Sequence, residues 1–157
     1  MDFQKFTENS LNSLKVAETI AKENNNPDIG QPHILYGLLT ISESLIYELI
    51  EGMKVNVNFF VKDVEEIIKK LPKVSGNLGQ MYMSANAVKV LDESLAVAQH
   101  MKDEYISVEH IFLAFLENAE SKIGEIFKKY KITKQNFLQE LKNIRGNTKV
   151  VNHDRII

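Results

Sequence analysis

The sequence contains Ile106-Ser107-Val108-Glu109-His110-Ile111-Phe112-Leu113-Ala114-Phe115-Leu116, which repeats the pattern of an earlier stretch, Ile29-Gly30-Gln31-Pro32-His33-Ile34-Leu35-Tyr36-Gly37-Leu38-Leu39. Both stretches begin with an isoleucine, pass through a helix-start signal and continue into a run of apolar residues. Ser107 is a preferred N-cap residue, and Pro32 suits the first turn of a helix. A helix that is apolar nearly all round has to be buried. Both stretches therefore predict short central helices.

The chain is an internal duplication with an offset of 77 positions (110 minus 33). The offset holds without a gap on both sides of the central stretch, which indicates two copies of one unit. The residues that match across the copies are Leu14 with Leu91, Ala21 with Ala98, Ile46 with Ile123, Glu48 with Glu125, Phe60 with Phe137 and Ile67 with Ile144.

Each copy has the periodicity of four helices. Apolar residues at helical spacing predict a first helix at about 8–24, and the central helices are expected at about 31–40 and 108–118. No segment alternates with period two long enough to form a strand. Residues that can cap the other helix starts recur at equivalent positions: Thr7 with Ser84, Ser44 with Ser121, and Asn56 with Thr133. We therefore predict an all-α fold, with two four-helix repeats in a pseudo-two-fold arrangement and eight helices in one compact domain.

The breaks between the helical patterns predict the domain boundaries. Repeat one covers about 3–70 and repeat two about 81–146, and the connector 71–80 has a proline and two glycines that interrupt any helix. The double domain is thus expected to cover 1–146. Residues 147–157 are expected to form an extended tail after a C-cap glycine.

Composition excludes several classes of function. The formal net charge is −2 and the charges are interspersed, so no basic stripe predicts nucleic-acid binding. The chain has no cysteine, its start lacks the layout of a secretion signal, and no apolar run approaches the ~18 residues of a membrane span. We expect a cytoplasmic protein without a membrane contact, and a monomeric isolated domain.

The sequence contains no motif of a catalytic, cofactor or metal site. Phosphate-binding GxxxxGK[ST] and GxGxxG loops and the GxSxG elbow are missing, and neither His33 nor His110 has tight metal-ligand spacing. The simplest interpretation of the two histidines is packing, or hydrogen bonding near the unpaired N–H groups of a helix start. A hydrolase using His110 with Glu109 is the alternative, but no nucleophile accompanies the pair.

Phe3, Phe6, Met81, Tyr82 and Met83 lie outside the helical stripes, just before the first helix of each copy. Such residues usually pack over a helix entrance. The alternative is an apolar groove between the copies, where adaptable methionines would suit varied ligands.

These features together resemble a known family. The doubled unit with its Ile-x-x-x-His-Ile-Leu-x-Gly-Leu-Leu core, the connector Leu71-Pro72-Lys73-Val74-Ser75-Gly76 and the ending Ile144-Arg145-Gly146 are similar to the N-terminal domain of the Clp ATPases. The core is shared by several types in this family. The connector and ending resemble the ClpB type, a protein disaggregase, and the likeness covers about residues 3–152.

The resemblance implies a function. The domain would engage exposed apolar segments of unfolded or aggregated polypeptides on behalf of a hexameric AAA+ ring that binds ATP and Mg²⁺ and works beside other chaperones. The tail would lead toward the AAA+ domain, and this chain itself would not be an enzyme. The alternative within the family is a ClpC- or ClpA-type domain, which docks adaptors for a Clp protease.

The resemblance also implies which residues handle substrate. Positions associated with substrate in the ClpB type match Thr7, Asp103 and Glu109. We add Phe6, Tyr82 and His110 as further candidates for substrate binding. Asp103 and Glu109 are expected on the rim of a groove, where they would attract basic residues of the client.

Overall fold

The computed structural model describes residues 2–76, 79–146, 149–151 and 153. These residues form a short 3-10 turn, η1 (Phe3–Lys5), and eight α-helices. The first repeat supplies α1 (Glu8–Glu23), α2 (Gln31–Thr40), α3 (Leu45–Gly52) and α4 (Val57–Lys69). The second repeat supplies α5 (Ala85–His100), α6 (Val108–Asn118), α7 (Ser121–Lys129) and α8 (Lys134–Arg145). The prediction of an all-α domain made of two four-helix repeats is confirmed.

Helix starts follow the predicted caps with one exception. The side chain of Thr7 accepts a hydrogen bond from a backbone N–H in the first turn of α1, and Ser84 does the same for α5. Ser44, Asn56 and Thr133 likewise cap α3, α4 and α8. The prediction that Ser121 caps α7 is wrong, because α7 begins one residue earlier than expected. Its start is set by a contact between the repeats, in which the side chain of Gln31 accepts the N–H of the residue before the helix, at 2.8 Å.

The two central helices are buried on nearly every side, as their composition predicts. In α2 only Tyr36 and Thr40 are more than slightly exposed, and in α6 the eight residues from 108 to 115 are all buried. Rings from four helices of both repeats meet at this core. Phe127 of α7 lies 6.2 Å from Phe60 of α4 and 5.6 Å from Phe112 of α6, which in turn lies 4.6 Å from Phe137 of α8. The repeats therefore share one core.

The residues just before the first helix of each repeat, which we call its entrance, pair with the other repeat. Phe6, just before α1, forms an isolated parallel bridge with Ile106, and Met83, just before α5, forms the same bridge with Ile29. Backbone hydrogen bonds of 2.8–2.9 Å flank both bridges. The two bridges are related by the 77-residue offset, so the exchange obeys the pseudo-two-fold symmetry. Neither repeat can complete its own entrance alone.

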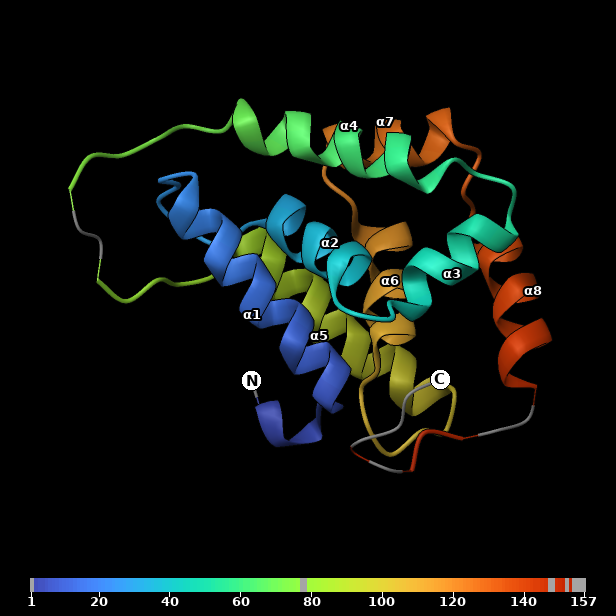
Figure 1. Cartoon of the computed structure of the whole chain (residues 1–157). Helices are drawn as coiled ribbons and strands as arrows, with labels where there is room; N and C mark the ends of the chain where they lie inside the picture. Colours follow the sequence, from blue (N-terminus) through green and yellow to red (C-terminus); the bar gives the residue numbers. More distant parts are fainter. Residues whose placement is uncertain (1, 77–78, 147–148, 152, 154–157) are drawn as a thin grey trace.

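Figure 1 shows how the helices are arranged. The fourth helix of one repeat runs beside the third helix of the other, since α4 contacts α7 and α3 contacts α8. α1 and α5 lie on the opposite side of the central helices from α8 (Figure 1). Among the described residues, no helix is both long and apolar enough to span a bilayer.

The connector and the tail are only partly described. Residues 77–78 of the connector and 147–148, 152 and 154–157 of the tail lie outside the described residues. Gly146 ends α8 as the C-cap residue with φ of +57°, which confirms the predicted glycine stop. The left-handed conformation costs glycine little, so the chain can turn sharply here.

Candidate functional site: a buried charged cluster beside an apolar groove

The six candidate residues fall into two groups. Tyr82 is exposed over 68% of its surface. The others are buried, with at most 8% exposure: Phe6, Thr7, Asp103, Glu109 and His110. The expectation that Asp103 and Glu109 stand on an exposed rim is wrong. Two carboxylates can be buried here because a cation and several hydrogen-bond donors are buried with them.

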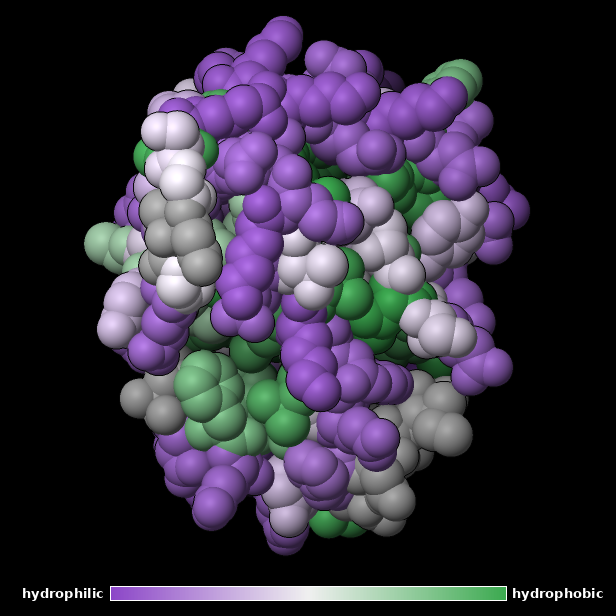
Figure 2. All heavy atoms as spheres, turned by 60° about the vertical axis from the view of Figure 1, so that its left-hand side comes forward, coloured by the Kyte–Doolittle hydropathy of each residue, from purple (hydrophilic) through white to green (hydrophobic). Residues whose placement is uncertain are grey.

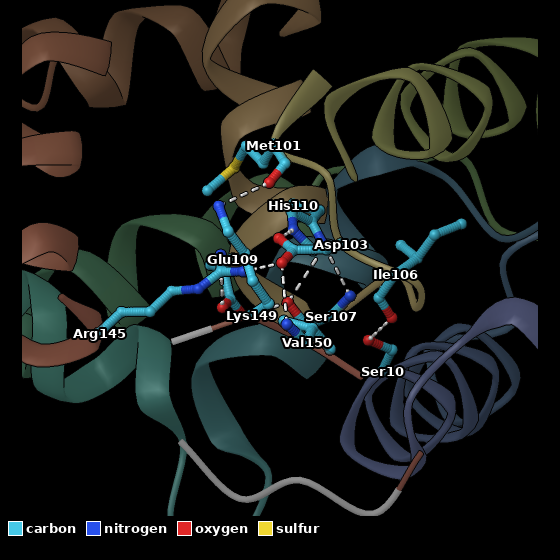
Figure 3. A network of polar contacts seen from close by, with 10 residues as sticks. All are labelled: Ser10, Met101, Asp103, Ile106, Ser107, Glu109, His110, Arg145, Lys149 and Val150. Carbon is cyan, nitrogen blue, oxygen red and sulfur yellow. Dashed lines mark hydrogen bonds and ion pairs between the residues drawn. The ribbon is translucent and has the colours of Figure 1, made fainter. Parts of the chain in front are cut away.

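Asp103, Glu109, His110 and Arg145 form what we call the charged cluster (Figure 3). The loop after α5 supplies Asp103, the first turn of α6 supplies the next two, and the last turn of α8 supplies Arg145. The Arg145 guanidinium contacts the carboxylates of both Asp103 and Glu109, the latter at 3.5 Å. Ser107 Oγ donates a hydrogen bond to the other oxygen of Glu109. The cluster thus joins three helices of the second repeat.

The two nitrogens of the His110 ring have different hydrogen-bonding roles. Its Nδ1 accepts the backbone N–H of Ser107 at 2.9 Å, so the ring proton belongs on Nε2. Nε2 lies 2.7 Å from Asp103 Oδ2 and donates to it. His110 therefore satisfies one unpaired N–H at the start of α6. This agrees with the simplest interpretation of the histidines, which was hydrogen bonding near a helix start. Glu109 faces Arg145 and Ser107, so the pair suggested for a hydrolase does not converge.

The electrostatics favour an ionised Asp103. Burial by itself would raise the pKa of the Asp103 carboxyl, but hydrogen bonds from His110, Arg145 and a backbone N–H outweigh it. They hold this pKa well below its usual range. Asp103 is therefore an anion at any physiological pH.

The first repeat has a neutral version of the same arrangement. His33 Nδ1 accepts the N–H of Gly30 at 2.8 Å, and its Nε2 lies 2.8 Å from the side-chain oxygen of Asn26. Asn26 occupies the repeat position of Asp103. Because burial disfavours the charged ring, the pKa of His33 is lowered to about 4. This histidine is neutral at physiological pH.

Sequence reasoning missed the role of Arg145 and of the tail residue Val150. Val150 is buried, and its N–H donates to Asp103 Oδ1 at 2.8 Å. A usable signal was present in the comparison of the repeats. Where the second repeat has Asp103 and Arg145, the first has Asn26 and the buried Ile68, so an opposite pair of charges appears together in one repeat only.

The exposed candidate, Tyr82, lines an apolar groove of about 670 Å³ beside α1. Residues of α1 and the segment 81–83 line it, together with Phe3, which has 43% of its surface exposed. Two carboxylates of α1, of Glu8 and Glu18, are among these residues. On the side of the molecule that carries α1, Figure 2 shows apolar areas in green between hydrophilic ones. Of the entrance residues, Phe3, Met81, Tyr82 and Met83 line this groove, whereas Phe6 lies in the core.

Within the described part of the chain, no group of three or more histidine, cysteine, aspartate or glutamate side chains could hold a metal ion. The site thus has two features, an apolar groove and a charged cluster that binds the backbone at Val150.

The fold defines a class of domain in which two four-helix repeats exchange their entrances around a shared core. Residues 5–130 match the family described as the Clp repeat (R) N-terminal domain. The chain belongs to this family.

Individual relatives agree with this assignment. The chaperone protein ClpB of Bacillus anthracis is 31% identical over 157 residues, which cover 98% of this chain and 18% of the relative. The chain thus spans less than a fifth of that protein's length. The Hsp104 N-terminal domain from Candida albicans has the same fold, with a TM-score of 0.83 at 23% identity, covering 95% of this chain and 97% of the other. A ClpV N-domain in complex with a VipB peptide matches with a TM-score of 0.72 at 19% identity, covering 92% and 89%.

Proposed function

We propose that this chain is the substrate-engaging N-terminal domain of a ClpB-type, ATP-dependent protein disaggregase. It binds exposed apolar segments of unfolded or aggregated polypeptides in the groove beside α1. The observation that carries this proposal is the groove itself, which presents the exposed rings of Phe3 and Tyr82 next to Met81 and Met83. The ClpB relative supports the type, and the ClpV complex supports a peptide as ligand.

The chemistry of the groove suits weak binding of varied sequences. Methionine side chains adapt to different shapes, and an aromatic ring offers a large apolar area. Each apolar client side chain contributes about 1.5–3 kcal/mol when it is fully buried, before ordering costs. Two or three such side chains give micromolar or weaker affinity, on the order of 8 kcal/mol or less. Weak binding is adequate for a domain that is present in several copies on one ring.

The six candidate residues would serve this function in different ways. Tyr82 contacts the client. Phe6 and Thr7 support the entrance of α1, since Phe6 bridges to Ile106 and Thr7 caps the helix. The remaining three, Asp103, Glu109 and His110, are buried and act on substrate handling only through what they hold in place.

The proposal extends to the whole protein. ATP and Mg²⁺ would bind to a separate AAA+ domain of a longer, cytoplasmic chain that assembles into a hexameric ring and cooperates with other chaperones. Reading the coding sequence beyond Ile157 tests this extension. A Walker A motif downstream supports it, and a stop codon directly after Ile157 contradicts it.

A titration tests the groove. A fluorescently labelled, permanently unfolded polypeptide is added to wild-type chain, to Tyr82→Ser and to Phe59→Ser, and anisotropy gives each Kd. Phe59 is a matched control, because it is 57% exposed on α4 and does not line the groove. Loss of one buried aromatic contact should raise the Kd of Tyr82→Ser about tenfold or more. Phe59→Ser should bind like wild type.

Two results would contradict the proposal. Equal affinity of Tyr82→Ser and Phe59→Ser would show that the groove is not the binding site. Saturable binding of one folded partner, with no binding of unfolded polypeptide, would favour the adaptor-docking alternative of the ClpC or ClpA type.

A further inference from the structure

After the fourth helix of each repeat, the chain returns to the loop that precedes the central helix of the same repeat. In the first repeat, the side-chain amide of Asn26 donates to the backbone oxygen of Pro72 at 3.1 Å. In the second repeat, the carboxylate of Asp103 accepts the N–H of Val150 at 2.8 Å. The oxygen of Pro72 and the N–H of Val150 belong to peptide units that are 77 positions apart. Equivalent side chains thus hold the equivalent peptide unit in both repeats.

The two repeats hold this peptide unit by opposite ends. The Asn26 oxygen faces the His33 ring, which leaves its NH₂ group to donate to a carbonyl. Asp103 has two acceptor oxygens, of which one faces the His110 ring and the other accepts an N–H. A carboxylate cannot donate while it is ionised. The residue type at this repeat position therefore decides which group of the returning chain is held.

Residues 149–151 and 153, which we call the exit segment, make further contacts. The backbone oxygen of Val150 accepts the N–H groups of Glu104 at 2.8 Å and Tyr105 at 3.3 Å. Lys149 Nζ donates to the oxygen of Met101 at 3.1 Å. The side chain of Val150 is fully buried. The exit segment is thus bound through both its backbone and its side chains, as Figure 3 shows for Lys149 and Val150.

The exit segment also contacts α1, the helix that lines the groove. The backbone oxygen of His153 accepts the N–H of Glu8 at 2.9 Å, and its ring lies 6.0 Å from the ring of Tyr105. Glu8 is the first residue of α1 and lines the apolar groove. The N–H groups of a first helical turn have no partner within the helix. The exit segment supplies one of the acceptors that α1 needs.

Of the two equivalent sites, only the one in the second repeat contains an ion pair. Arg145 contacts the same oxygen of Asp103 that accepts the Val150 N–H, whereas the first repeat has the apolar Ile68 at this position. We propose that the charged cluster is a docking site for the exit segment. Asp103 and Arg145 are its positioning residues, and docking couples the direction in which the chain leaves the domain to the start of α1. This proposal does not rest on the proposed function, because docking of the exit segment is defined by contacts within the domain.

The variant Asp103→Asn tests the docking site in the 157-residue chain. Its amide oxygen would stay with the His110 ring, as in the first repeat, and its NH₂ group would then oppose the N–H of Val150. Backbone order parameters from ¹⁵N relaxation report on this segment without depending on global stability. We expect Val150 to change from about 0.85, typical of rigid backbone, to below about 0.6, while the helices keep their values.

A second variant and a control keep the test decisive even if Asp103→Asn does not fold. Val150→Pro removes the donor and leaves the charged cluster intact. It should lower the order parameter of Val151 and shift the amide signal of Glu8, which loses its acceptor. Asn26→Asp is the matched control in the first repeat, and it should leave Val150 rigid.

Three results would overturn the proposal. The first is a rigid Val150 in folded Asp103→Asn, and the second is an unmoved Glu8 signal when Val150→Pro has released the segment. The third is weakened binding of the unfolded polypeptide by Asp103→Asn while Val150 stays docked, because Asp103 would then serve the client directly. If Tyr82→Ser instead fails to weaken client binding, only the proposed function is lost.

Discussion

A Cβ atom on Gly37 would lie 2.2 Å from the backbone oxygen of Ser13. Real Cβ atoms essentially never approach a backbone atom this closely, so α1 and α2 can pack as they do only around a glycine. The second repeat has the buried Ala114 at the equivalent position, between α5 and α6. The first pair of helices is therefore packed more tightly at this point than its counterpart.

Gly37→Ala should destabilise the fold. Separating the two helices to admit a methyl group costs about 1–3 kcal/mol, which exceeds the gain in helix propensity. Gly124→Ala is the control, because Gly124 lies in α7 with open space around it and should stabilise the chain by up to about 1 kcal/mol. Urea unfolding followed by circular dichroism measures both. Equal stability of the two variants would show that the α1–α2 contact tolerates a side chain.

Arg145→Ala should be among the most destabilising single changes. It leaves two buried carboxylates without their cation, which typically costs about 3–5 kcal/mol. The ion pair between Lys134 and Glu117, at 2.6 Å, is exposed on both sides and provides the comparison. Lys134→Ala should cost at most about 1 kcal/mol. Urea unfolding measures the loss of stability in both variants. A similar loss in the two would mean that the buried carboxylates do not depend on Arg145.

Stability should fall between pH 6.5 and pH 4 because of His33. The folded-state pKa is about 4, whereas the unfolded value is 6.5. As the pH falls through this window the unfolded chain binds a proton that the folded chain does not, so stability is lost by up to about 3 kcal/mol. Asp103 acts in a lower window, since its lowered pKa stabilises the fold above the usual carboxyl range and this contribution disappears at stronger acidity.

The matching measurement is urea unfolding of wild type and of His33→Gln at pH 8, 6 and 4.5. The variant should lose less stability than wild type between pH 8 and pH 4.5. An equal loss in both chains would assign the acid sensitivity to other groups.

The groove is lined by the two carboxylates of Glu8 and Glu18 and by one cation, Lys15, so its excess negative charge should favour basic clients. Glu8→Gln with Glu18→Gln should weaken binding of apolar peptides that carry a lysine, by up to about fivefold at low salt, because exposed charge pairs contribute up to about 1 kcal/mol. A peptide without charged residues should bind both chains alike. The difference should vanish at 1 M salt, where screening is strong. A loss that persists at high salt would indicate a change in the shape of the groove.

The fold could be predicted from the sequence because the duplication shows each pattern at two positions, so each copy supports the prediction made from the other. The apolar runs around His33 and His110 specify buried helices, and the residue at each helix start specifies most caps. The start of α7 could not be predicted in this way. It depends on Gln31, which lies 89 positions away in the sequence and meets α7 only after the repeats have packed.

The candidate site was predicted less well, for a physical reason. Asp103 and Glu109 look like surface residues because isolated charges are rarely buried. Their burial depends on Arg145 and on the return of the chain at Val150, which are contacts between residues far apart in the sequence. Tyr82 and Phe6 both lie outside the helical stripes, yet Tyr82 is exposed and Phe6 is buried, so the stripe pattern did not decide which of the two would face solvent.

The central claim is that unfolded polypeptide binds in the groove beside α1, and mapping by NMR tests it most directly. Unlabelled, permanently unfolded polypeptide is titrated into the ¹⁵N-labelled chain, and the shifts of the backbone amides are followed. The account predicts that the largest shifts occur at Leu11, Lys15 and Tyr82, which line the groove. Shifts that gather instead at Leu138 and His100, in the separate groove lined by α5, α6 and α8, would contradict it.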